Sequence, residues 1–116
     1  MKMSNKEMWE SIQTLMGVEE KGKLGYACSR NLRKLMDACR EYMEIRDRLL
    51  MENGVDQGGG KFRLSPEAAQ KMSQELSQYE DIEHEVSIMT VTEEVFCGGS
   101  LTSKQMYALS WMVEEG

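Results

Sequence analysis

The stretch from Glu20 to Glu52 carries a repeat of apolar residues that constrains the fold more strongly than any other feature of the sequence. Its apolar positions recur at intervals of four, three, four, three and seven residues. These positions are Cys28, Leu32, Leu35, Cys39, Tyr42 and Leu49. Arg46 occupies the place that would complete the repeat. The spacing predicts one long amphipathic helix with a narrow seam of the coiled-coil kind.

The length of this helix limits how a single domain can hold it. At full length it would span about 50 Å, whereas a compact chain of 116 residues is only about 35 Å across. We therefore expect the helix to break near Gly22 or Gly25, to protrude, or to pack against a second copy. The residues of such an oligomer seam would be Leu32, Leu35, Cys39, Tyr42 and Leu49.

Two shorter helices are indicated by capping residues and apolar periodicity. Ser4 with Glu7 forms a capping box ahead of a helix over residues 5–16. Ser65, followed by proline, starts another over residues 66–79. The apolar positions of this second helix recur at three and four residues, as they do in the seam of the long helix. Antiparallel pairing of the two is therefore expected.

The remaining segments predict a small sheet and a last helix. Residues 61–64 follow a glycine run and indicate a short strand, and residues 85–91 alternate with the period of a strand. We expect these two strands to pair, because a lone strand leaves its backbone groups without partners. A helical turn is expected at 93–97, and Thr102 caps a helix that continues to about Glu114.

These elements together predict an α+β fold that is mostly helical. We expect a long helix packed on two or three shorter helices, with a small two-stranded sheet. The length indicates a single domain over residues 1–116. Within it, residues 1–53 form a helical and nearly neutral half of charge +1, and residues 54–116 an acidic α+β half of charge −7.

The acidic half contains a long interval without lysine or arginine. Between Lys71 and Lys104 there are seven carboxylates and no such cation. They are Glu75, Glu80, Asp81, Glu83, Glu85, Glu93 and Glu94. Direct nucleic-acid binding by this half is disfavoured, because phosphates require positive charge. An acidic surface of this kind would instead meet a basic groove on another protein, as a mimic of nucleic acid.

A basic strip on the long helix provides an alternative binding surface. Its residues are Lys23, Tyr26, Arg30 and Lys34. Such a strip would hold a nucleotide or another small anion. It would equally serve as a solvated face whose charge is balanced by Asp37 and Glu41 through pairing along the helix. The sequence leaves both readings open and favours the solvated face.

Catalytic and metal-binding patterns are weak in this chain. Cys28 and Cys39 fall on the seam and are expected to be buried, whereas Cys97 precedes two glycines and is expected to be exposed. A pair of Cys97 with His84 would be needed for thiol catalysis, but solvated His84 among acids is the simpler expectation. Adjacent carboxylates such as Glu80 and Asp81 are too common to indicate acid–base catalysis. We expect neither an enzyme, nor a cofactor, nor a metal site.

The sequence contains neither a run long and apolar enough for a membrane span nor a secretory signal. No run approaches the roughly 18 apolar residues of a membrane span, and the first residues do not have the pattern of a secretory signal. The three cysteines are an odd number and lie far apart, which favours a reducing compartment. We therefore expect a cytoplasmic protein without membrane contact.

Three stretches of the chain resemble a known group of proteins. The first is KGKLGYACSRNLRKL at residues 21–35, the second is Ile82–Val86 with the strand that follows, and the third is ALSWMV at residues 108–113. Together they cover about half of the chain. They are similar to a loose family of small, uncharacterised proteins of bacteriophages and prophages of Gram-positive bacteria. That family has no assigned activity, so no catalytic residue carries over to this chain.

The resemblance implies a setting for the function. Small accessory proteins of phages often bind and redirect host proteins, including nucleases and other defence enzymes, as anti-CRISPR inhibitors do. The leading hypothesis is therefore a protein that binds and inhibits or redirects a host protein through its acidic surface. The alternatives are an oligomeric binder of a nucleotide or other small anion, and a structural or assembly protein that works by self-association.

Overall fold

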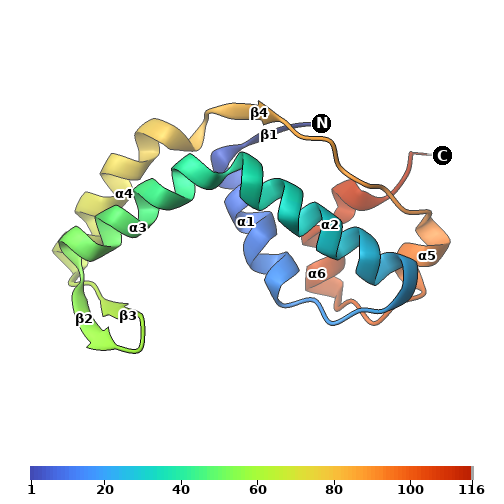
Figure 1. Cartoon of the computed structure of the whole chain (residues 1–116), viewed down its shortest axis with the longest axis horizontal. Coiled ribbons are helices and arrows are strands. Elements are labelled where there is room, and N and C mark those ends of the chain that lie inside the picture. Colours follow the sequence, from blue (N-terminus) through green and yellow to red (C-terminus); the bar gives the residue numbers. More distant parts are fainter. Residues whose placement is uncertain (116) are drawn as a thin grey trace.

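The structure is a computed structural model that describes residues 1–115. It is an elongated arc with extents of 46 × 29 × 21 Å (Figure 1). The elements follow in the order β1 (Lys2–Ser4), α1 (Asn5–Met16), α2 (Gly22–Ala38), α3 (Arg40–Asn53), β2 (Val55–Gly58), β3 (Lys61–Arg63), α4 (Pro66–Glu80), β4 (Glu83–Glu85), α5 (Glu93–Cys97), α6 (Ser103–Ala108) and the 3₁₀ turn η1 (Ser110–Met112). The prediction of an α+β fold that is mostly helical is confirmed.

The long helix begins at Gly22, one of the two places where a break was expected, and a division at Cys39 was not expected. Helix α2 begins at Gly22 and ends at Ala38, and α3 begins at Arg40. Between them Cys39 has φ −95° and ψ 6°, although its amide still donates to Leu35 O (2.8 Å) and its carbonyl still accepts from Met43 N (2.9 Å). The helix bends here because its two halves pack on different partners: α2 lies against α1, and α3 lies against α4.

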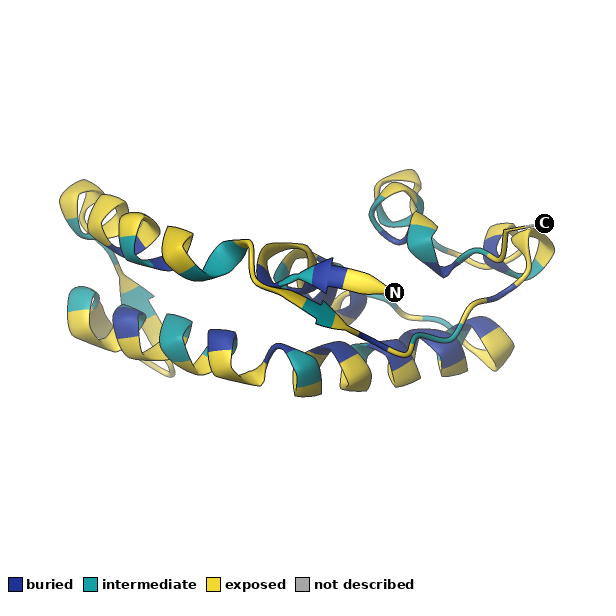
Figure 2. Ribbon diagram, turned by 90° about the horizontal axis from the view of Figure 1, so that it is seen from above, coloured by how far each residue is buried: buried dark blue, intermediate teal, exposed yellow. Residues whose placement is uncertain are grey.

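The core lies where α1 crosses α2 (Figure 1). The predicted capping box is confirmed, since Glu7 N donates to Ser4 Oγ (3.1 Å) and Ser4 N donates to Glu7 Oε1 (3.0 Å). Helix α1 buries Met8, Ile12 and Leu15 between α2 on one side and α6 on the other. Figure 2 shows the buried residues of the α2–α3 ribbon on the side that faces the other helices, with the exposed residues on the outer side.

The sheet prediction was wrong in its pairing. Strand β3 pairs antiparallel with β2 in a hairpin, and β4 pairs antiparallel with β1 at the start of the chain. The hairpin forms locally because Gly58, Gly59 and Gly60 all adopt positive φ, a conformation that glycine tolerates best. The strand expected over 85–91 was wrong: β4 ends at Glu85, residues 86–90 are not in a strand, and Val91 forms only an isolated bridge. The pairing of β4 with the N-terminus was not anticipated.

The two helical segments expected in the last part of the chain are present, but the second is shorter than predicted. The turn at 93–97 is confirmed as α5, capped by Thr92. The capping box of Thr102 with Gln105 is also confirmed, but α6 ends at Ala108 rather than near Glu114. A 3₁₀ turn follows, and the chain then extends so that Val113 forms a parallel bridge with Val91.

Candidate functional site

The residues of the predicted oligomer seam lie in the core of a single chain. Four of them are at most 3% exposed, and the fifth, Leu32, is half-buried against the same cluster. The four are Leu35, Cys39, Tyr42 and Leu49. Helices α1 and α4 of the same chain cover the seam. The seam is therefore an intramolecular core, and it does not offer a free face for a second copy.

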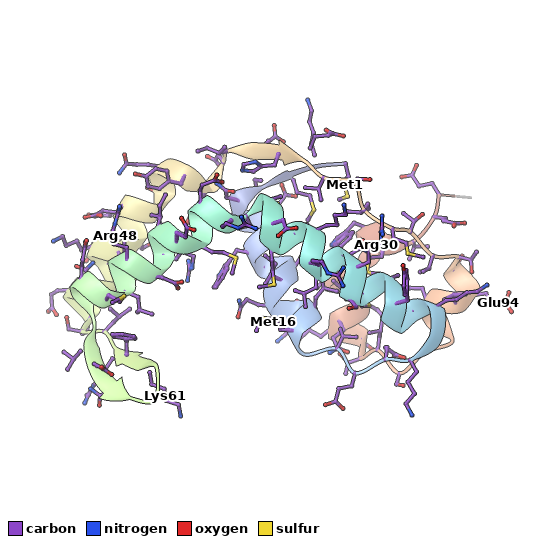
Figure 3. All side chains as sticks on the ribbon, viewed as in Figure 1. Met1, Met16, Arg30, Arg48, Lys61 and Glu94 are labelled. Carbon is purple, nitrogen blue, oxygen red and sulfur yellow. The ribbon has the colours of Figure 1, made fainter. Side chains whose placement is uncertain are left out.

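The seven predicted acidic residues form two separate groups. One group lies along α4 and β4. The other consists of Glu93 and Glu94 on α5, and Figure 3 places Glu94 at the far end of the molecule from α4. The first group comprises Glu75, Glu80, Asp81, Glu83 and Glu85. Within it Glu85 binds the amino group of Met1 at 3.0 Å. The charge that remains is therefore concentrated where α4 ends and β4 begins.

We call this place the acidic corner and define it by Glu41, Glu80, Asp81 and Glu83. Helix α3 contributes Glu41, which lines a hollow of about 210 Å³ together with the side chain of Ile82. None of the four carboxylates has a cationic partner within 4.0 Å among residues 1–115. Ile82 itself is 48% exposed, with Glu41 in the same hollow and with Glu80, Asp81 and Glu83 within two residues of it in the chain.

The backbone at the acidic corner is held in place by hydrogen bonds. The amide of Ile82 donates to Tyr79 O (3.3 Å), and its carbonyl accepts from Asn5 N (2.9 Å). Asn5 is buried, and its Nδ2 donates to Tyr79 O (2.8 Å). Its Oδ1 then accepts from His84 Nε2 (3.0 Å), so that this ring nitrogen carries the proton. The exposed side chain of Ile82 is therefore presented by an ordered segment.

His84 differs from the sequence-based expectation. It was expected to be solvated among acids, but it is half-buried and its ring is bound to Asn5. Cys97 ends α5, which Figure 1 shows well apart from β4. The structure therefore does not bring the two residues together as a catalytic pair.

The cysteines lie as the sequence predicted, with Cys28 and Cys39 buried and Cys97 exposed. Burial raises the pKa of Cys28, and the nearby Glu20 carboxylate raises it further. Burial also raises the pKa of Cys39 to about 11, although Arg46 acts in the opposite direction. Because the thiolate is the nucleophile, both raised values make these two thiols poorly reactive near neutral pH.

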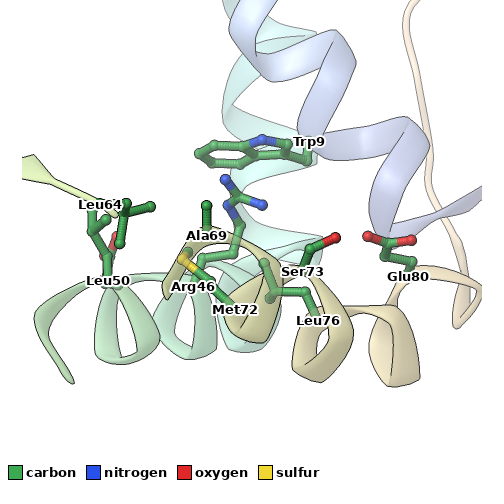
Figure 4. A pocket seen from close by; sticks show the side chains of 10 residues that line it. Trp9, Arg46, Leu50, Leu64, Ala69, Met72, Ser73, Leu76 and Glu80 are labelled. Atoms are coloured by element: carbon green, nitrogen blue, oxygen red, sulfur yellow. The ribbon is translucent and has the colours of Figure 1, made fainter. Parts of the chain in front are cut away.

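A groove between α1, α3 and α4 contains residues that the sequence analysis did not assign to a site. It has a volume of about 340 Å³ and is lined mainly by apolar side chains. Trp9 from α1 lies over Arg46 from α3, with the guanidinium carbon 4.2 Å from the ring centroid (Figure 4). The signal in the sequence was Arg46 itself, a cation at a position of the seam where an apolar residue was expected.

The basic strip of α2 is exposed, as predicted. Tyr26 is 63% exposed, and Lys23, Arg30 and Lys34 also face solvent. The expected balancing acid, Asp37, pairs with Arg40 at 3.0 Å and not with the strip. At one end of the strip Lys23 lines a hollow that also contains Glu19, Glu20 and Glu94. Lys21 lines this hollow as well, so three carboxylates outnumber two lysines there and oppose the binding of a small anion.

Searches against protein-family models, curated proteins and solved structures find no match. Among residues 1–115 there is no cluster of three or more metal-binding side chains. No helix in the same range has the length and apolar character needed to cross a membrane.

Proposed function

We propose that this protein acts by binding another protein, and that the acidic corner docks on a basic surface of that partner. In the setting that the resemblance implies, the partner is a host protein that a phage accessory protein inhibits or redirects. The observation that carries the proposal is that the four carboxylates of the acidic corner, three of them within two residues of the exposed Ile82 and the fourth in its hollow, have no cationic partner among residues 1–115. Complementary charge at an interface speeds encounter and selects the partner.

The position of two of these carboxylates supports the proposal independently. Glu80 and Asp81 lie at the C-terminus of α4, whose last turn has no basic residue. Carboxylates at this end of a helix oppose the macrodipole and lower stability. A local arrangement that costs stability is typical of positions retained for function. This cost supports a binding role for the acidic corner over a role in solubility alone.

Affinity capture from a bacterial lysate tests the proposal when it compares matched charge variants. Immobilised wild-type protein would be compared with the double variant Asp81→Lys/Glu83→Lys. The control is Glu114→Lys/Glu115→Lys, which makes the same change in net charge at two exposed residues outside the acidic corner. We expect a captured protein that is lost with the corner variant, retained with the control, and released by raising the salt concentration.

The partner identified in this way would then be purified and its Kd measured against all three proteins. We expect the corner variant to weaken binding at least tenfold and the control to change it less than twofold. Equal loss with both variants would mean that net charge, and not the acidic corner, drives the interaction. Retention by the corner variant would refute the proposal.

A further inference from the structure

We propose that the groove between α1, α3 and α4 is a docking site for an amphipathic helix of the partner, with its apolar face in the groove and basic residues at one end. This docking groove is defined by Trp9, Arg46, Leu50, Leu64, Met72 and Leu76. The inference rests on the proposed function and deepens it, because Glu80 belongs both to the acidic corner and to the lining of the groove.

The arm that α3 and α4 form is incompletely packed. These two helices pack on each other, and α1 reaches the arm only near its own N-terminus (Figure 1). Leu50 and Leu64 are only half-buried, and Ala69 is exposed, although all three line the groove. Apolar faces of helices are stable when a further layer covers them. A third helix along this arm would supply that layer.

The shape of the groove favours a helix as its occupant. The walls come from the helices α1, α3 and α4, and only Leu64, which follows β3, lies outside a helix. Because the backbone groups of a helix are bonded internally, these walls offer an extended peptide no strand edge to extend. The residues that α4 contributes recur at intervals of three and four: Ala69, Met72, Ser73, Leu76 and Glu80. Figure 4 shows apolar side chains from Leu64 and Leu50 at one end of the groove to Leu76 near Glu80 at the other. This apolar row, which Arg46 and Ser73 interrupt, fits the apolar stripe of a further helix.

The charges that line the groove favour a basic occupant. Asp47 and Glu80 line the groove, and neither has a cationic partner within 4.0 Å in the described part of the chain. The guanidinium carbon of Arg46 lies 4.2 Å from the centroid of the Trp9 ring, and this cation–π contact stabilises part of the arginine charge. Asp81 and Glu83 follow Glu80 in the chain, where α4 ends and β4 begins. A helix with lysine or arginine at that end matches these carboxylates, whereas a second copy, of net charge −6, would meet like charge.

Tryptophan and arginine are the residue types that most often dominate the energy of a protein interface. Here they lie stacked at the wall of a groove of about 340 Å³, which is enough room for large apolar side chains. Trp9 also provides the means to observe docking, because the chain has only one other tryptophan. That residue, Trp111, donates its Nε1–H to Ser11 Oγ at 3.2 Å, on the other side of α1 from the arm.

The experiment uses the full chain carrying Trp111→Phe, so that fluorescence reports on Trp9 alone. The probe is a synthetic 18-residue helical peptide of leucine and lysine, and its counterpart has glutamate in place of lysine. Ala69→Arg places a bulky cation in the groove, and Gln74→Arg makes the same charge change at an exposed position of α4 outside it. Circular dichroism would establish that both variants are folded.

We expect saturable binding of the lysine peptide and a change in Trp9 fluorescence. Ala69→Arg should weaken this binding at least tenfold, Gln74→Arg less than twofold, and the glutamate peptide should not bind. Equal binding by the two variants, or equal binding of the two peptides, would overturn the inference. A dimer in light scattering that Ala69→Arg dissociates would also overturn it, in favour of a second copy as the occupant. If Ala69→Arg leaves lysate capture intact while Asp81→Lys/Glu83→Lys abolishes it, the groove inference fails and the proposed function stands.

Discussion

Reversing the charge at the C-terminus of α4 is expected to stabilise the protein while it weakens partner binding. Asp81 is the exposed C-cap residue of α4, and its carboxylate faces the negative end of the helix dipole. In Asp81→Lys an unfavourable charge is replaced by a favourable one. The same substitution at Glu67, in the first turn of the same helix, does the reverse, because a carboxylate is favourable there.

The expected size of the effect follows from the position of each charge. A charge in the last turn of an exposed helix contributes about 0.3–1 kcal/mol, so a reversal changes the free energy of unfolding by about 0.5–2 kcal/mol. For a domain of this length, about 1 kcal/mol corresponds to a change in Tm of about 4 °C. We expect Asp81→Lys to raise Tm by about 2–8 °C and Glu67→Lys to lower it by a similar or smaller amount.

Thermal and urea unfolding of the two variants would measure this difference. Both variants change the net charge from −6 to −4, so a general relief of repulsion would shift both midpoints in the same direction. Opposite shifts that shrink in 1 M salt would support the dipole argument, since salt screens exposed charges. Shifts of the same sign would refute it, and with it the inference that the acidic corner is retained at a cost in stability.

Two further predictions concern buried groups. Asn31 is fully buried, its Nδ2 donates to Met89 O (2.8 Å), and its Oδ1 accepts from Met89 N (2.7 Å). Asn31→Ala would leave both backbone groups without these bonds. In urea titrations it should lower the free energy of unfolding by about 2–4 kcal/mol. A loss below about 0.5 kcal/mol would contradict this role of Asn31. Burial raises the pKa of Cys39 from 9.0 to about 11, so the native state binds this proton more tightly than the unfolded chain does. The associated stability is present below pH 9 and should be lost as the pH rises toward 11, at up to about 1.4 kcal/mol per pH unit. Cys39→Ala should flatten this dependence, and an unchanged slope would show that other groups cause it.

Local signals in the sequence were sufficient to locate most helices. Capping boxes at Ser4 and Thr102 and the Ser65–Pro66 pair mark helix starts that the structure confirms. These signals are reliable because a cap satisfies backbone groups within a few residues of itself. The fold class, and the burial of Cys28 and Cys39, followed from periodicity in the same way.

The candidate site was predictable only in part. The acidic interval between Lys71 and Lys104 is visible in the sequence, but its division into two distant groups is not, because a loop carries α5 to the other end of the arc. Glu41 joins the acidic corner from a different helix, through the pairing of α3 with α4. The stacking of Arg46 on Trp9 likewise joins residues that are far apart in the chain.

The sequence by itself determined where most helices begin, which faces are apolar and how the charge is distributed between the halves. Tertiary structure decided the bend at Cys39, the pairing of β1 with β4 and the covering of the seam by the same chain. The physical reason is the range of the interactions. Caps and helical periodicity act over a few residues, whereas strand pairing and packing depend on which distant segments meet, and many segments offer similar apolar stripes.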